Sequence, residues 1–93
     1  MNIGARLKAI NDEIDVLRTE ARIMAEQIDF QSDVSEDARI RAIVSETPLA
    51  DRDSREAGDD LARMQRVQAD LETRIKALRA EQDKLLERML EQR

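Results

Sequence analysis

The sequence predicts an all-α protein: an antiparallel helical hairpin of the coiled-coil type with a kinked first arm, expected to dimerise into a four-helix bundle. Charged residues make up 40% of the 93 residues and aromatic residues 1%, which is typical of coiled coils. The one proline, Pro48, lies near the middle of the chain, and proline disfavours the continuation of a helix. Apolar residues on both sides of it alternate at intervals of four and three. We therefore expect a single domain over residues 1–93, folded back at a turn over about residues 47–52.

The first arm is expected to begin with a helix over about residues 3–31. Its seam residues, spaced by four and three, are Ile3, Leu7, Ile10, Ile14, Leu17, Ala21, Met24 and Ile28. A second apolar line, spaced by seven, runs beside this seam and consists of Val16, Ile23 and Phe30. One partner helix cannot cover both lines. The second line is therefore expected to pack against the middle segment or a second subunit, and a ligand groove is the alternative.

A short middle helix is expected over about residues 35–46. Residues 31–34 interrupt the apolar pattern, and Ser35 has the side chain of an N-cap. The large apolar residues of this segment are out of phase with the first seam, because the positions in phase are small or polar: Ser35, Ala38, Ala42 and Ser45. The pattern therefore predicts a kink or an offset near residue 32.

The last helix is expected over about residues 53–92. Residues 53–56 (Asp-Ser-Arg-Glu) have the spacing of a capping box. The seam that follows is Ala57, Leu61, Met64, Gln68, Leu71, Ile75, Leu78, Gln82, Leu85 and Met89. An amide in a seam favours one register and orientation of the helices. Gln68 and Gln82 are expected to do so here, and hydrogen bonding to a ligand or partner helix is the alternative.

A two-helix hairpin leaves six apolar side chains poorly covered. Each contributes roughly 1.5–3 kcal/mol when it is fully buried. We expect these residues to form the contact between two copies in a homodimer: Val16, Ile23, Phe30, Val67, Leu86 and Leu90.

Acidic residues concentrate at the bend. Residues 32–60 carry nine acids and four bases, whereas residues 61–93 carry six acids and eight bases. The acids either cap and solvate the start of the last helix or form a partner-binding tip, and the candidates for that tip are Asp51, Asp53, Glu56, Asp59 and Asp60. Bases elsewhere alternate with acids, so direct binding of nucleic acid is not expected.

Composition argues against most catalytic and membrane functions. The chain has neither His nor Cys, and therefore lacks the commonest general base and metal ligand as well as any thiolate. We expect no enzyme activity, no cofactor and no metal site. No apolar stretch is long enough to cross a bilayer, so we expect a cytoplasmic protein without membrane contact.

The acidic bend resembles the N-terminal coiled coil of Gre-type transcript-cleavage factors of bacteria. The similar stretch is about residues 40–78, and the shared motif is Asp-x-x-Glu, here Asp53 and Glu56. In that family these acids help to hold a catalytic magnesium ion in the site of RNA polymerase, and the resemblance implies the same partner. Ala57 stands where the family usually has Asn, and these 93 residues contain no counterpart of the family's C-terminal globular domain.

The first helix is also faintly similar to coiled-coil anti-sigma factors that bind cyclic di-GMP. The residues that align with their motif are Asp15, Thr19, Arg22, Glu26 and Phe30, of which only Arg22 is identical. Together, these patterns predict a non-enzymatic protein-interaction or regulatory module that acts on bacterial transcription machinery, RNA polymerase or a sigma factor, through its acidic tip. The alternatives are a structural coiled-coil assembly component and a cleavage-type factor of the polymerase secondary channel.

Overall fold

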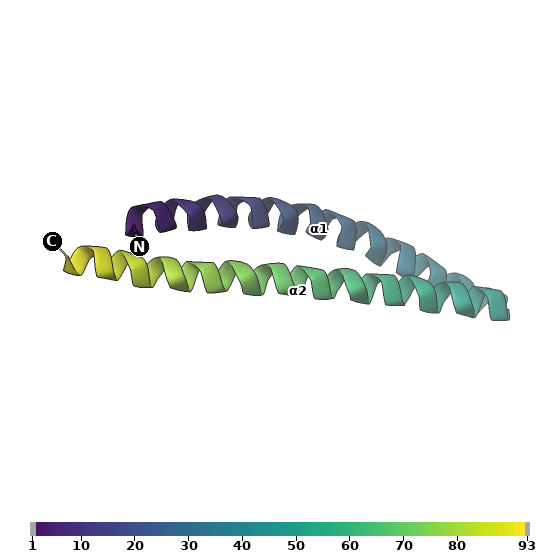
Figure 1. The fold of residues 1–93 in the computed structure, drawn as a ribbon. Coiled ribbons are helices and arrows are strands. Elements are labelled where there is room, and N and C mark those ends of the chain that lie inside the picture. Colours follow the sequence, from purple (N-terminus) through teal and green to yellow (C-terminus); the bar gives the residue numbers. More distant parts are fainter. Residues whose placement is uncertain (1, 93) are drawn as a thin grey trace. The chain divides into compact units, whose positions relative to one another are not determined.

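The computed structural model describes residues 2–92 and consists of two long α-helices, α1 (Ile3–Ser45) and α2 (Pro48–Glu91). The two helices run in opposite directions (Figure 1). No strand occurs among the described residues. The predicted antiparallel helical hairpin is therefore confirmed. Neither helix, over the residues that the structure describes, has a stretch long and apolar enough to cross a membrane.

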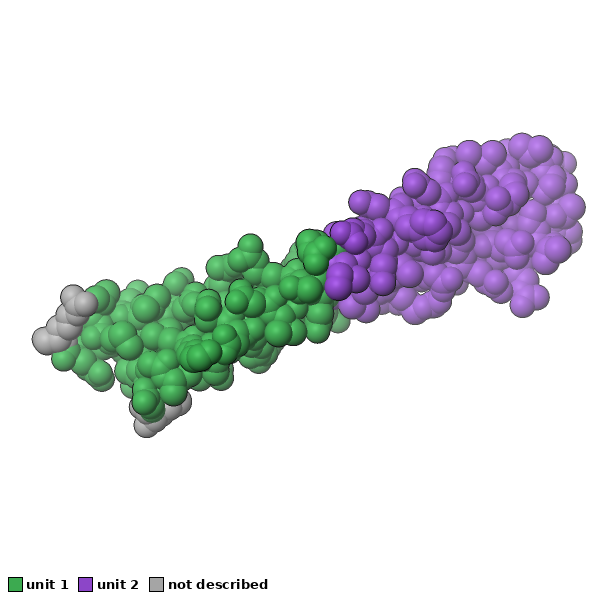
Figure 2. All heavy atoms as spheres, turned by 90° about the horizontal axis from the view of Figure 1, so that it is seen from above, with its two compact units in different colours: residues 1–22, 70–93 green, residues 23–69 purple. Residues whose placement is uncertain are grey.

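The chain divides into two compact units, coloured separately in Figure 2. Unit 1 comprises residues 1–22 and 70–93, and unit 2 comprises residues 23–69. Each unit contains a stretch of both helices, and unit 2 contains the bend. The core and the surface of each unit can therefore be considered separately.

The bend is shorter than predicted. Only Glu46 and Thr47 link the two helices. Thr47 caps α2, because its Oγ1 accepts a hydrogen bond from the Ala50 N–H at 3.2 Å. Pro48 is the first residue of α2, a position where its missing N–H costs no helical hydrogen bond. The predicted turn over 47–52 and the helix start at 53 are therefore wrong, since a proline that cannot continue one helix can begin the next.

Glu46 ends α1 in a left-handed conformation, with φ at 50°. Its N–H donates to the Ala42 carbonyl oxygen at 3.1 Å, which closes the last turn of the helix. Glycine usually occupies such a position, because a Cβ there crowds the backbone. The tight connection therefore stores strain at Glu46.

The first arm is one continuous helix. The predicted interruption over residues 31–34 and the separate helix over 35–46 are wrong, because α1 runs unbroken through both. The kink near residue 32 stays a prediction. The inward-facing positions continue the same alternation of four and three, through Gln31, Ser35, Ala38 and Ala42, all buried or half-buried. The seam therefore continues through this stretch although most of its side chains here are small.

Small residues of α2 complete this part of the seam in unit 2. They are Ala50, Ser54, Ala57 and Gly58, again buried or half-buried. A Cβ added to Gly58 would lie 4.0 Å from Ser35 Oγ, so the backbone of α2 passes close to the side chains of α1. Such a close approach leaves no room for large side chains between the helices. Ile40, Ile43 and Val44 therefore lie outside the seam.

Large aliphatic residues form the core of unit 1, as the sequence predicts. Ile10, Ile14, Leu78 and Leu85 are buried in one cluster. Ile3, Leu7 and Leu17 pack against that cluster and are half-buried. Interlocking of long aliphatic side chains from two helices supplies the apolar burial that stabilises this unit.

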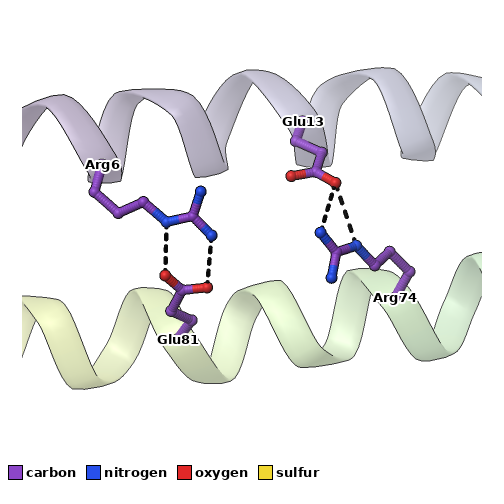
Figure 3. Close-up of polar contacts among 4 residues, drawn as sticks. All are labelled: Arg6, Glu13, Arg74 and Glu81. Atoms are coloured by element: carbon purple, nitrogen blue, oxygen red, sulfur yellow. Dashed lines mark hydrogen bonds and ion pairs between the residues drawn. The ribbon is translucent and has the colours of Figure 1, made fainter.

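Two ion pairs join α1 and α2 beside this core (Figure 3). Arg6 binds both carboxylate oxygens of Glu81, through Nε at 2.7 Å and Nη2 at 2.8 Å. Arg74 donates from Nε and Nη2 to Glu13 Oε1 at 3.2 and 2.9 Å. The hydrogen bonds from Arg6 lower the pKa of Glu81. Both pairs couple residues whose numbers add up to 87, so they fix one antiparallel register within unit 1.

The seam glutamines behave differently from one another. Gln31 Nε2 donates to the Ala57 carbonyl oxygen at 3.1 Å, which makes it the amide that bonds across the helices in unit 2. Gln68 Oε1 is buried and has no hydrogen-bond partner among the described residues. Gln82 is half-buried. The pairing amide is thus Gln31, in the stretch that the sequence suggests as an interruption.

Candidate functional site at the bend

Four large apolar side chains surround the bend and are exposed to solvent. The exposed fraction is 48% for Ile40, 61% for Ile43, 78% for Val44 and 68% for Leu49. They are displaced from the seam by the small residues described above. Clusters of exposed apolar side chains on soluble proteins commonly mark interaction sites. The bend is therefore the first candidate for a functional surface.

Three of these side chains line a hollow between the two helices. This hollow, called the bend hollow below, has a volume of about 370 Å³. Its lining residues, all in unit 2, are Ala38, Ile40, Arg41, Val44 and Ser45 of α1, Thr47 of the link, and Leu49, Ala50 and Asp53 of α2. A second hollow of about 300 Å³ is lined by Arg39, Ala42, Ile43, Asp51, Ser54 and Arg55. The bend hollow is the more apolar of the two, because three large aliphatic side chains line it.

The five predicted tip acids do not form one cluster. Asp53, Glu56 and Asp60 follow one another at intervals of three and four, and therefore share one flank of α2. Asp51 lines the second hollow instead, and Asp59 is exposed elsewhere on the helix. No group of three or more acids suited to a metal ion is found in the described part of the chain.

Two of these acids are held in ion pairs on their own helix. Arg52 Nε donates to Glu56 Oε1 at 2.9 Å, and this bond raises the pKa of Arg52. Arg63 Nη2 forms an ion pair with Asp60 Oδ1, three residues before it on α2. Asp53 lines the bend hollow and makes no hydrogen bond or ion pair with another described residue. Its carboxylate is the acid of the bend hollow that is available to a partner.

The capping interpretation of residues 53–56 is wrong. Because α2 begins at Pro48, Asp53 and Glu56 lie within the helix and cannot cap its first turn. Asp51 lies in that first turn, and its negative charge interacts favourably with the N-terminus of the helix. Asp53 therefore loses the structural role that the sequence suggests for it.

The net charge of the protein resides in unit 2. Residues 23–69 contain eleven acids and six bases, a net charge of −5, whereas the remaining residues contain ten of each. Of the charged residues between 32 and 60, those without an ion pair to another described residue are the acids Asp33, Asp37, Glu46, Asp51, Asp53 and Asp59 and the bases Arg41 and Arg55. The surface of the bend is therefore apolar and acidic.

The residues predicted for self-association are all exposed. Val16, Leu86 and Leu90 belong to unit 1, and Ile23, Phe30 and Val67 belong to unit 2. Ile23 and Phe30 lie seven residues apart on α1, and Val44 lies fourteen residues further on, so all three share one stripe in unit 2. Homodimer formation stays a prediction.

Sequence reasoning missed the apolar side chains of the bend as a site. It placed Ile40, Ile43 and Val44 on one apolar face of a separate short helix, out of phase with the first seam. The signal that could have found them is the uninterrupted spacing of the small residues, which places larger neighbours on the outside. Comparison with known proteins yields no match to a family model, a curated protein or a solved structure. The function of the protein is therefore inferred from the structure of the bend.

Proposed function

We propose that this protein is a non-enzymatic protein-interaction module that binds another protein through its bend. The observation that carries this proposal is the exposure of Ile40, Val44 and Leu49 around a hollow at the tip of the hairpin. Each of these side chains contributes roughly 1.5–3 kcal/mol when it is fully buried. Only a partner can provide that burial, because the seam beneath is filled by small residues.

Bacterial transcription machinery is the partner class that we propose for this module, with RNA polymerase or a sigma factor as the protein bound. The support is the similarity of the bend to Gre-type factors, together with the position of Asp53 and Glu56 on one exposed flank of α2. Two carboxylates do not complete a magnesium site, since this ion prefers six oxygen ligands. A cleavage-type role therefore requires further ligands from the polymerase.

Site-specific photo-crosslinking tests the bend as the binding surface. A photo-reactive phenylalanine analogue would replace Val44 or Leu49, one at a time, in the full-length protein in the source cells. The same analogue at Ala80, an exposed residue of unit 1, is the control. We expect the two bend positions, and not position 80, to crosslink to one protein. Equal crosslinking from position 80, or none from the bend, would refute the proposal.

A structural role in a coiled-coil assembly is the second candidate. It is favoured by the exposed Leu86 and Leu90 on α2 of unit 1, which are four residues apart and so share one face. Sedimentation of the wild type at tens of micromolar is expected to show a dimer. Leu86→Glu and Ile23→Glu should shift it to monomer, whereas Ala80→Glu should leave it unchanged. A wild type that sediments as a monomer would contradict this candidate.

A further inference from the structure

We infer that the partner element in the bend hollow is an amphipathic helix with apolar residues on one face and lysine or arginine beside them. This inference rests on the proposed function, because it names the chemistry of the partner that the bend binds. Its grounds are the shape of the bend hollow and the charge around it.

The shape of the bend hollow suits a helix that presents successive apolar anchors. Its lining extends from Ala38 to Ser45 on α1 and from Thr47 of the link to Asp53 on α2. Seven residues of helix span roughly 10 Å, or about two turns. A groove of that length accepts two side chains spaced by three or four on a partner helix, which is the usual manner of helix-in-groove recognition.

The lining of the bend hollow combines apolar contact with an available charge. Ile40, Val44 and Leu49 provide the apolar surface, and Asp53 provides a carboxylate that makes no hydrogen bond or ion pair with another described residue. Arg41 is the base of the lining. Asp37 lies four and seven residues before Arg41 and Val44, and so belongs to the same flank of α1. The carboxylates near the bend hollow can therefore pair with bases that flank the apolar face of a bound helix.

Charge also decides against other occupants. A second copy of the bend would bring together two units that each carry a net charge of −5, and like charges at an interface oppose association. A nucleic acid is repelled for the same reason, because its phosphates require basic contacts. A basic helix is the occupant that both the apolar lining and the acidic surroundings favour.

The flank of α2 extends the acidic surface beyond the bend hollow. Asp53, Glu56 and Asp60 follow each other along this flank. Glu56 forms an ion pair with Arg52, and Asp60 forms one with Arg63. Bases spaced by three and four on a partner helix would meet carboxylates at the same spacing. Asp53, which forms no ion pair with another described residue at salt-bridge distance, is expected to make the strongest of these contacts.

Binding of a designed peptide to the full-length protein tests this inference. The probe is a fluorescein-labelled helical peptide of leucine and lysine with its leucines on one face, and binding is followed by fluorescence anisotropy. A second peptide with glutamate in place of lysine is the matched probe. We expect the lysine peptide to bind and the glutamate peptide to bind at least about tenfold more weakly, with the difference shrinking as salt is added. Equal binding of the two peptides would overturn the inference.

Variants of the protein locate the binding at the bend hollow. Val44→Ser with Leu49→Ser should weaken binding of the lysine peptide by at least about tenfold, because its apolar anchors lose their contacts. Asp53→Asn should weaken it by about two- to fivefold, as expected for one exposed ion pair. The control Ala80→Ser alters an exposed residue of unit 1 and should leave peptide binding unchanged. A loss in the control equal to that in the bend variants would refute the assigned site.

The two experiments separate this inference from the function on which it rests. If the bend crosslinks to a cellular protein whose contacting segment is acidic or extended, the interaction function holds and the basic helix is refuted. If neither crosslinking nor peptide binding occurs at the bend, both fail.

Discussion

Replacement of Gln68 by methionine should stabilise the protein. Gln68 Oε1 is buried between the helices of unit 2 without a hydrogen-bond partner among the described residues. A buried polar group in this condition costs about 1–3 kcal/mol, whereas an apolar side chain of the same shape avoids that cost. Glutamine and methionine have similar helix propensities, so the backbone contributes little to the difference. We expect the free energy of unfolding to rise by about 1–3 kcal/mol.

Urea denaturation followed by circular dichroism measures this change. Thermal denaturation is a second measurement of the same change. In a domain of this size, a gain of 1 kcal/mol should raise the melting temperature by about 4–8 °C. Gln82→Met is the matched control, since Gln82 is also a half-buried seam residue of α2 but has no buried oxygen that lacks a partner. Its stabilisation should be clearly smaller. If Gln68→Met has no effect, or if the two variants gain equally, the unpaired oxygen is not the cause.

The same substitution separates the two roles expected for the seam glutamines. If Gln68 only restricts helix register, Gln68→Met stabilises the chain and leaves partner binding unchanged. If Gln68 Oε1 accepts a hydrogen bond from a partner, the variant is more stable but binds more weakly. Measurement of both quantities on one variant therefore decides between the alternatives.

Four other substitutions probe the bend and one of the ion pairs. Glu46→Gly should raise the free energy of unfolding by about 1 kcal/mol, because glycine adopts the left-handed conformation without crowding; a loss of stability in urea denaturation would contradict the strain at this position. Thr47→Ala should lower the free energy of unfolding by about 0.5–2 kcal/mol, because the cap of α2 is lost. Asp53→Asn should change the free energy of unfolding by no more than about 0.5 kcal/mol. A larger loss for Asp53→Asn than for Thr47→Ala would support a capping role for Asp53. Arg6 lowers the pKa of Glu81 below its ordinary value of 4.5, so the stabilising effect of their pair is present above pH 4.5 and is lost as the pH falls through the lowered pKa. The stability of wild type and Glu81→Gln, measured by urea denaturation against pH, should therefore converge below pH 4.5, and parallel curves would argue against this contribution.

The sequence predicted the helical hairpin and the core of unit 1 because both follow from helical periodicity. Residues such as Ile10, Ile14, Leu78 and Leu85 recur at intervals of four and three, and any helix places residues at that spacing on one face. Their large aliphatic side chains made the inner face unambiguous. The structure buries all four.

The prediction from the sequence was wrong where the size of the residues and their position in the helical repeat indicated different faces of the helix. In the stretch up to Ser45, the positions in phase with the seam are small, and the large residues lie out of phase. This change of phase of the large apolar residues therefore led to the prediction of a break and a separate short helix. The structure keeps the phase and leaves Ile40, Ile43 and Val44 outside, because close helices bury small side chains. Spacing was the reliable signal here, and hydrophobicity was not.

The acidic tip was predictable as a composition but not as a geometry. The sequence places five acids within ten residues, yet only the helix start at Pro48 determines which of them share a flank and which lie in the first turn. Reading residues 53–56 as a capping box moved that start by five residues. Asp53 was therefore interpreted as a cap, although it lies beside Leu49 at the bend hollow.

Unit 1 and unit 2 serve different purposes in the proposed function. Unit 1 has equal numbers of acids and bases, a core of four buried aliphatic residues and two ion pairs between its helices, all of which favour folding. Unit 2 has small residues in the part of its seam next to the bend, the whole net charge and most of the exposed large apolar side chains. The side chains that we assign to partner binding, Val44, Leu49 and Asp53, are exposed and contribute little to either core. Selection on the bend surface can therefore alter the partner without unfolding the hairpin, which is a useful property in a recognition module.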